Sequence, residues 1–272
     1  MSTATSTVTS KDGTEIAFDR LGSGPSVILV DGALCYRASG PMAPLAKDLA
    51  AQFTVYTYDR RGRGESGDTK PYSPEREIED IAALVSEAGG TAALFGASSG
   101  AVLALDAAAR LDGVSRVAAY EPPFVVDDTH PPRPQDYLDR MDRLVASGQR
   151  GAAVKMFLKS VGVPGAALVV MRLLPVWSRL TSVAHTLPYD FRVLGDTGSG
   201  KPLPKDRWES VRVPVLVMDG GKSPTWMRNG TRQLAEVLPN SEYRTLPGQT
   251  HMVKAEAVGP ALVEFLGDSP AK

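Results

Sequence analysis

The sequence predicts an α/β protein in which a mostly parallel sheet is covered by helices on both faces. Short apolar runs rich in Val and Ile alternate with longer segments of helical periodicity, as parallel strands joined by helices require. Apolar residues make up 43% of the 272 residues, which is enough for the sizeable core that such a sheet needs.

The expected elements begin with two strands and then alternate between helix and strand. We expect strands at 14–18, 26–30, 54–58, 92–95, 115–120, 213–218 and 242–245. We expect the helices that cover this sheet at 42–52, 74–88, 99–111 and 253–266. The helix at 74–88 carries Glu75, Glu77 and Glu79 near its start, where the helix dipole favours negative charge.

The alternation breaks off after the strand at 115–120. Helical patterns without a convincing strand follow at 137–147, 152–161 and 175–185. The polar run 195–206 is rich in Gly and Pro and is typical of a linker that returns to the sheet. We therefore expect a core made of residues 1–125 and 201–272, with a helical cap of residues 126–200 inserted in it.

Composition excludes several classes of protein. The chain has 30 Lys and Arg against 31 Asp and Glu, so nothing in it favours binding to nucleic acid. Cys35 is the single cysteine, so no internal disulfide and no cysteine cluster for a metal can form. The N-terminus is polar and lacks the apolar core of a signal peptide. The uncharged run 88–105 is interrupted by Gly, Ser and Thr, unlike a membrane span. We expect a cytoplasmic protein that acts on a small molecule without a metal or other cofactor; its oligomeric state is left open.

Ser98 lies between two glycines in the segment GASSG, residues 96–100. The segment follows an apolar strand and opens a helix, which is the setting of a nucleophile elbow. The small neighbours allow a sharp turn, and the helix N-terminus beneath it favours a developing negative charge. The alternative is a small-residue turn without chemistry. The strand–turn–helix context favours the nucleophile.

A serine hydroxyl needs a general base, and the chain has three histidines. His251 follows the last expected strand, at the same edge of the sheet as Ser98, and is the favoured base. His130 stands in the Pro-rich start of the cap and is typical of a solvated surface residue. His185 lies inside the cap, where packing or a substrate contact is a better interpretation than catalysis.

Two backbone segments are expected to supply hydrogen-bond donors for an oxyanion. One is the N–H of Ser99, and the other is the loop after the strand at 26–30, where Gly32 or Ala33 can donate. Cys35 lies in this loop too, and we interpret it as a pocket wall rather than a nucleophile. The apolar residues of the cap predict an apolar pocket. Candidate substrate contacts are Leu34, Trp177 and His185.

Taken together, these motifs resemble the α/β-hydrolase superfamily over nearly the whole chain. They are VDG after the strand at 26–30, YDRRGRGES at 58–66, GASSG, and GQTH before the last helix. The resemblance implies the α/β-hydrolase fold and the chain order nucleophile, acid, base. The family includes esterases, lactonases, thioesterases and C–C bond hydrolases. Its epoxide hydrolases and haloalkane dehalogenases typically use an Asp nucleophile, and Ser98 argues against both.

The acid departs from the common family pattern. Family members commonly place it three residues beyond the glycine of the segment PVLVMDG, where this chain has Ser223. Asp219 is near that position, and Glu121 follows an earlier strand. The chain is locally similar to zearalenone-type lactonases, in which a Glu at the end of that strand is the triad acid. The resemblance therefore favours Glu121. The alternatives are Asp219 as the acid, and a Glu121 that pairs with an Arg at the cap junction.

The sequence thus predicts a serine hydrolase that cleaves a carboxylic ester or lactone carrying an apolar acyl or ring group. In this prediction Ser98 attacks the carbonyl, His251 transfers the proton and Glu121 orients His251. A thioester or C–C bond hydrolase with the same triad remains open. The alternative from another class is a ligand receptor that keeps the fold without the reaction.

Overall fold

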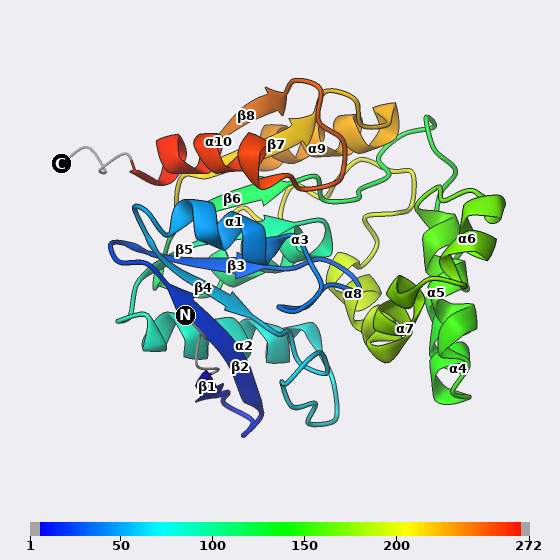
Figure 1. Ribbon diagram of the computed structural model, residues 1–272. Helices are drawn as coiled ribbons and strands as arrows, with labels where there is room; N and C mark the ends of the chain where they lie inside the picture. The colour runs from blue at the N-terminus through cyan, green and yellow to red at the C-terminus, as the bar shows by residue number, and fades with distance from the viewer. Residues whose placement is uncertain (1–5, 268–272) are drawn as a thin grey trace.

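The computed structural model describes residues 6–267, and a single sheet runs through them (Figure 1). Within these residues eight strands lie in the spatial order β1-β2-β4-β3-β5-β6-β7-β8. The strands are β1 (Ser6–Thr9), β2 (Glu15–Leu21), β3 (Ser26–Val30), β4 (Thr54–Tyr58), β5 (Ala92–Ala97), β6 (Val114–Tyr120), β7 (Val215–Gly220) and β8 (Ser241–Leu246). Only the pairs β1–β2 and β2–β4 are antiparallel, so the predicted α/β class and mostly parallel sheet are confirmed.

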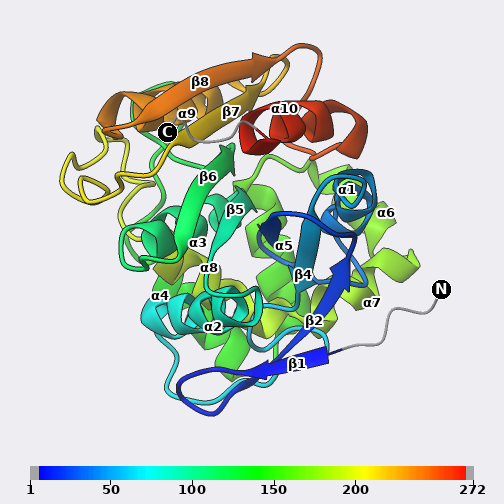
Figure 2. The same cartoon turned by 90° about the vertical axis from the view of Figure 1, so that its left-hand side faces the viewer.

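Helices cover both faces of the sheet, and Figure 2 shows the two layers on opposite sides of it. On one face α1 (Met42–Leu49) packs beside α10 (Ala255–Gly267). The other face carries α2 (Pro74–Glu87), α3 (Ser99–Ala108) and α9 (Thr225–Val237). Because both faces are covered, the central strands are apolar along nearly their whole length.

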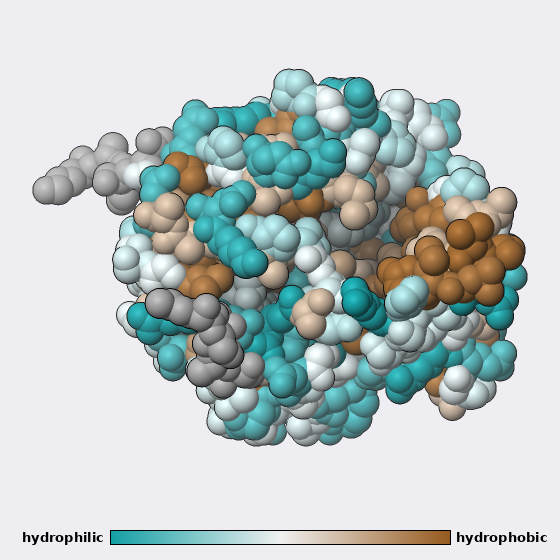
Figure 3. Space-filling model, in the orientation of Figure 1, coloured by the Kyte–Doolittle hydropathy of each residue, from teal (hydrophilic) through white to brown (hydrophobic). Residues whose placement is uncertain are grey.

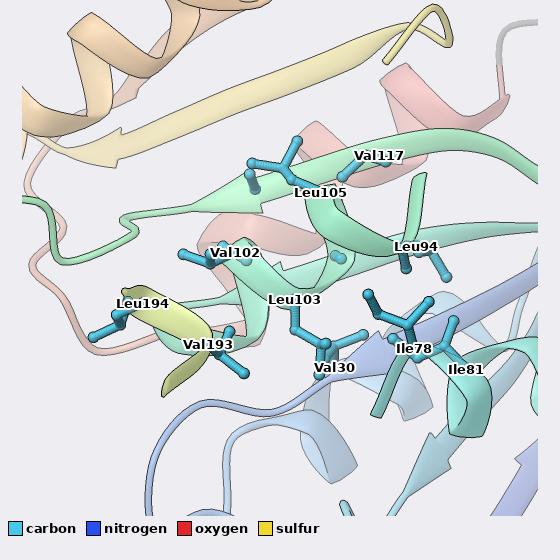
Figure 4. Close-up of a cluster of buried hydrophobic side chains, with 14 of the residues drawn as sticks. Val30, Ile78, Ile81, Leu94, Val102, Leu103, Leu105, Val117, Val193 and Leu194 are labelled. Atoms are coloured by element: carbon cyan, nitrogen blue, oxygen red, sulfur yellow. The ribbon is translucent and has the colours of Figure 1, made fainter. Parts of the chain in front are cut away.

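The buried apolar side chains form one cluster on each face of the sheet. Figure 4 shows part of the larger cluster, where Val102 and Leu103 of α3 lie between the strands and neighbouring helices. Burial of each such side chain stabilises the fold by about 1.5–3 kcal/mol. These two clusters hold the strand ends, and the loops that follow them, in fixed positions.

A group of helices lies between β6 and β7, beyond the carboxyl ends of the parallel strands (Figure 1). It contains α4 (Tyr137–Ala146), α5 (Arg150–Ser160), α6 (Gly165–Met171), α7 (Pro175–Ser182), the 3-10 turn η1 (Ala184–Thr186) and α8 (Leu187–Leu194). We call residues 137–194 the helical insertion. Its last helix, α8, joins the larger cluster, where Val193 and Leu194 pack with α3 (Figure 4). The insertion is therefore anchored to the core through α8.

Several elements differ from the sequence-based expectation. The helix expected at 175–185 is divided into α7 and η1, and β1, α6, α8 and α9 were not expected at all. In α9 the interior residue Gly230 weakens the helical pattern of the sequence, because glycine is a poor helix former. A side chain there would lie 2.5 Å from the carbonyl oxygen of Phe124, so close packing excludes anything larger than glycine. Among residues 6–267, no helix has the length and apolar character needed to cross a bilayer.

Candidate active site

Three neighbouring strands end in loops with unusual backbone geometry. Within residues 6–267, the non-glycine residues with positive φ are Leu34 at 62°, Ser98 at 57° and Glu121 at 45°. They follow β3, β5 and β6, which are adjacent in the sheet. A side chain in this conformation costs on the order of 1 kcal/mol and persists only where the surroundings impose it. The strained positions thus gather at one edge of the sheet.

The elbow at Ser98 depends on its two glycines. A Cβ atom at Gly96 would lie 2.2 Å from the carbonyl oxygen of Gly100, and one at Gly100 would lie 2.3 Å from that of Val30. The first turn of α3 therefore passes too close to β3 and β5 for any side chain at these positions. The N–H of Ser98 donates to the carbonyl oxygen of Tyr120, which ties the elbow to β6.

Glu121 connects the elbow region to His251. Its side chain is completely buried, and its Oε2 lies 2.9 Å from Nδ1 of His251. Its Oε1 accepts a 2.6 Å hydrogen bond from the N–H of Gly220. Because the carboxylate engages Nδ1, the remaining ring nitrogen, Nε2, is available to accept a proton.

The loop that carries His251 is fixed by close backbone packing. A Cβ atom at Gly220 would lie 2.6 Å from the carbonyl group of Gln249, so the end of β7 and this loop touch directly. The hydroxyl of Tyr120 donates a 2.6 Å hydrogen bond to the carbonyl oxygen of Thr250. Strands β6 and β7 together hold the His251 loop beside Glu121.

Asp219, the other candidate acid, has different partners. It is also completely buried, but its Oδ2 accepts from Nε of Arg228 at 2.9 Å and from the hydroxyl of Tyr243 at 2.6 Å. Glu121, by contrast, has no arginine among its hydrogen-bond partners in the described part of the chain. The structure joins Glu121, and not Asp219, to His251.

The loop after β3 lies against Ser98. A Cβ atom at Gly32 would be 3.0 Å from Cβ of Ser98 and 3.7 Å from its Oγ. The N–H groups of Gly32 and Ala33 have no hydrogen-bond acceptor within residues 6–267. Ser99 is the first residue of α3, where helix geometry leaves the N–H without an intrahelical partner. Three N–H groups, two from the loop after β3 and one from the start of α3, are thus available near the serine, and such groups can stabilise an oxyanion.

The remaining predicted residues divide between the site loop and the insertion. Leu34 is buried in the loop after β3. Burial raises the pKa of the neighbouring Cys35 thiol to about 12, so it is protonated at neutral pH and a poor nucleophile. Trp177 packs beside Gly151 of α5, inside the insertion. Burial lowers the pKa of His185, which lies at the junction with the core near Gly62. Within residues 6–267, these contacts of Trp177 and His185 do not include Ser98 or His251.

Sequence reasoning missed a set of charged residues behind the site. Arg60, Arg63 and Asp190 are buried and joined by ion pairs. The two arginines belong to the quoted motif YDRRGRGES. The sequence therefore indicated that this segment matters, but it did not indicate that the two side chains are buried. Asp190 is the single acidic residue of α8, and only the packing of this helix brings it to the site.

A separate groove of about 940 Å³ lies between α2, α4, α8 and the loop after α8. Its lining includes Tyr72, Arg133 and Phe191 but none of the predicted catalytic residues.

Among the residues described, no three His, Cys, Asp or Glu side chains gather as metal ligands do. The candidate active site lies at the carboxyl ends of β3, β5 and β6, where the strained residues and the contact between Glu121 and His251 are found.

Comparisons with known proteins agree with this fold. One solved structure, an alpha/beta hydrolase from Sphaerobacter thermophilus DSM 20745, is 54% identical, with a TM-score of 0.88 over 96% of this chain and 100% of that one. The enol-lactonase from Burkholderia xenovorans LB400 has a TM-score of 0.75 at 19% identity, covering 97% and 100% of the two chains, and so shares the fold. The uncharacterized hydrolase YraK of Bacillus subtilis (strain 168) is 36% identical over 98 residues, about a third of each chain.

A family model described as the alpha/beta hydrolase family matches residues 16–257, which is most of the chain and includes Ser98, Glu121 and His251. The protein therefore belongs to the alpha/beta hydrolase family.

Proposed function

We propose that this hydrolase cleaves a carboxylic ester or lactone through an acyl-enzyme formed on Ser98. The observation that carries the proposal is the 2.9 Å contact between Glu121 and Nδ1 of His251 at the edge of the sheet that bears the strained Ser98. A buried carboxylate on Nδ1 selects the tautomer whose Nε2 accepts a proton, as a serine nucleophile requires.

The reaction follows from these groups in two halves. In the first, Ser98 Oγ attacks the carbonyl carbon while His251 takes its proton, and Glu121 stabilises the imidazolium. The N–H groups of Ser99 and of the Gly32–Ala33 loop hold the oxyanion, and the leaving alkoxide receives the proton from His251. In the second half, water attacks the acyl-enzyme with His251 as base, which releases the acid and restores Ser98.

The substrate is proposed to be a small molecule with an apolar acyl or ring group. The insertion exposes large apolar side chains, and Met252 beside His251 is 68% exposed. Figure 3 shows an apolar surface over the insertion, next to a hollow in that face of the molecule. The exposed apolar side chains of the insertion are Val161, Val169, Val170, Leu173 and Leu174. Among proteins that share the fold, one is named as an enol-lactonase and one as a thermophilic esterase, which supports these two substrate classes.

The proposal is tested by labelling with a fluorophosphonate probe and by a panel of p-nitrophenyl esters and lactones. We expect one equivalent of label on Ser98, and a loss of kcat on the order of 10⁶ in Ser98→Ala. Ser223→Ala is the matched control, because Ser223 is also buried near the sheet edge and its Oγ has no hydrogen-bond partner among the described residues. This control should retain labelling and turnover.

The outcomes separate the candidate functions. Cleavage of esters or lactones by the wild type, lost in Ser98→Ala, supports the proposal. Labelling of Ser98 with turnover only of thioesters or of C–C bonds next to a carbonyl would overturn the substrate class. Absence of both labelling and turnover would overturn the mechanism and favour a receptor on the same fold.

A further inference from the structure

Two arginines of the segment at 58–66 are completely buried behind the loop that follows β3. Arg60 and Arg63 are each 1% exposed, and both reach the carboxylate of Asp190 on α8. Nη1 of Arg60 lies 2.7 Å from Oδ1 of Asp190, and Nη2 of Arg63 lies 2.8 Å from its Oδ2. A single carboxylate from the insertion therefore holds both guanidinium groups.

The arginines in turn hold the carbonyl oxygens of the site loop. Nη1 of Arg63 donates to the carbonyl oxygen of Gly32 at 2.6 Å and to that of Cys35 at 3.1 Å. Nη1 of Arg60 donates to the carbonyl oxygen of Asp31 at 3.2 Å. Charged donors make these bonds stronger than ordinary backbone contacts. The loop after β3 is thus held from behind at three carbonyl groups.

Fixing a carbonyl also fixes the N–H of the same peptide unit. In a trans peptide the C=O and the following N–H point in opposite directions. Since the carbonyls of Asp31 and Gly32 face the arginines, the N–H groups of Gly32 and Ala33 face away from them. These are the two N–H groups that lack an acceptor within the described residues and that belong to the loop against Ser98.

Asp190 reaches the second donor segment as well. Its Oδ1 accepts a 2.7 Å hydrogen bond from Oγ of Ser99, the residue after the nucleophile. Burial pushes the pKa of Asp190 upward, but the charges of Arg63 and Arg60 outweigh it and hold this pKa below its ordinary value. Glu77 binds Arg60 through two hydrogen bonds of 2.6 and 2.7 Å, so two carboxylates balance the two buried arginines.

We propose that Asp190 and Arg63 are positioning residues for the oxyanion donors, which makes helix α8 of the insertion a part of the catalytic apparatus. Asp190 holds Ser99 directly and the Gly32–Ala33 loop through Arg63. The inference rests on the proposed serine mechanism. It goes beyond that mechanism because it assigns a catalytic effect to residues that touch neither substrate nor the reacting atoms.

A neighbouring ion pair provides a matched control. Arg61 binds Asp80 through bonds of 2.6 and 2.8 Å, and both side chains are completely buried. This pair ties α2 to the segment at Asp12, and its hydrogen bonds within residues 6–267 do not reach the loop after β3. Asp80→Asn therefore breaks a buried pair of the same kind without touching the oxyanion donors.

The test compares Asp190→Asn with Asp80→Asn in the full-length protein. The first readout is the rate at which a fluorophosphonate labels Ser98, which requires no knowledge of the natural substrate. We expect Asp190→Asn to label about 10²-fold more slowly than the wild type, since loss of one oxyanion donor costs about 10²–10³-fold. Asp80→Asn should label within about threefold of the wild type, although both variants lose thermal stability.

A second readout separates positioning from general destabilisation. On the best p-nitrophenyl ester, Asp190→Asn should lower kcat while KM stays within about threefold, because the oxyanion exists only beyond the ground state. Affinity for a trifluoromethyl ketone that mimics the tetrahedral intermediate should fall in parallel with kcat. Ser99→Ala removes only the hydroxyl that reaches Asp190, and should lower the labelling rate about fivefold without unfolding the protein.

Each outcome bears on a different statement. Equal labelling rates in Asp190→Asn and Asp80→Asn would overturn the positioning role and leave the serine mechanism intact. A wild type that is not labelled on Ser98 would overturn the mechanism, and this inference with it. If Asp190→Asn does not fold, an unchanged labelling rate in Ser99→Ala overturns the role, and a slower rate supports it.

Discussion

The ends of β6 and β7 carry two buried carboxylates that occupy neighbouring positions in the sheet but bind different partners. The N–H of Glu121 donates to the carbonyl oxygen of Met218, so Glu121 lies beside Asp219 in the extended register. Both side chains are completely buried. Asp219 nevertheless binds Arg228 and Tyr243, whereas Glu121 binds His251 and the N–H of Gly220.

The backbone at Glu121 distinguishes the two residues. Asp219 lies within β7 in ordinary extended conformation, while Glu121 has a φ of 45° just after β6. This left-handed residue redirects its side chain relative to the strand. A carboxylate at a strand end therefore becomes the partner of the histidine through backbone direction and contacts, and not through burial or position alone.

The largest effect expected from this comparison is that of Glu121→Gln. The amide keeps the shape, but its NH₂ group or the altered tautomer of His251 disturbs proton transfer, and kcat should fall about 10⁴-fold. Steady-state kinetics on the best ester, with a thermal melt to show intact folding, measure this. Near wild-type activity here, together with an inactive Asp219→Asn, would reverse the assignment of the acid.

A smaller loss is expected from Gly220→Ala. The added methyl group would lie 2.6 Å from the carbonyl group of Gln249, so the His251 loop and the N–H that holds Glu121 must move apart. Displacements of about 1 Å near a catalytic group can cost about 10²-fold in kcat. Gly221→Ala is the control, since its methyl group would meet Thr245 at an acceptable 3.4 Å. Equal kinetics in the two variants would contradict the role of this contact.

Asp219→Asn should affect stability more than turnover. It weakens the ion pair with Arg228, whose side chain is one-third exposed, because it removes the negative charge of the buried partner. We expect a loss of about 1–2 kcal/mol in the free energy of unfolding and a kcat within about threefold of the wild type. Urea denaturation and ester hydrolysis measure the two quantities. A kcat loss as large as that of Glu121→Gln would show that strand-end carboxylates are not separable in this way.

Asp31 is a third buried carboxylate at a strand end, and it makes the stability of the protein depend on pH. Burial raises its pKa to about 7 against the partly offsetting charges of Arg63 and Arg60, and within residues 6–267 its Oδ1 has no hydrogen-bond partner. The folded state holds this proton more tightly than the unfolded state does. The contribution of Asp31 to the free energy of unfolding is therefore complete below about pH 4 and is lost as pH rises to about 7.

Asp31→Asn removes this pH dependence. Its melting temperature relative to the wild type should rise between pH 5 and pH 8, by on the order of 5 °C, since about 2–3 kcal/mol of ionisation cost is relieved. Thermal melts of both proteins across this pH range measure the difference. A difference that stays constant with pH would mean that Asp31 does not titrate between the folded and unfolded states.

Much of the fold could be predicted from local sequence. The ranges expected for β3 and β4 match the structure because continuous β-branched and apolar runs, bounded by turn residues, are typical of buried parallel strands. The turn at Ser98 could be predicted for a similar reason, since two glycines, a preceding strand and a following helix are all local features. Strand β1 was missed because it is a short, mostly exposed edge strand, and its polar sequence carries no burial signal.

Other features depended on contacts between distant residues. In α8 the buried Asp190 interrupts the apolar pattern, and its partners Arg60 and Arg63 lie about 130 residues earlier in the chain. No local periodicity can report a carboxylate that is stabilised only by such distant charges. The surroundings of Trp177 likewise carry no local signal, because its packing beside Gly151 of α5 is a contact between separate helices.

Local sequence was enough to predict the α/β class, the strand–turn–helix at Ser98 and the position of a histidine after the last strand. These depend on residue size, apolar periodicity and chain order, which act over a few neighbouring positions. Tertiary structure alone decided that Glu121 contacts His251 and that Asp190 reaches the arginines behind the Gly32 loop. The direction of a side chain at a strand end follows from the backbone angle that packing imposes, and a buried charge is tolerated only where folding brings its partner.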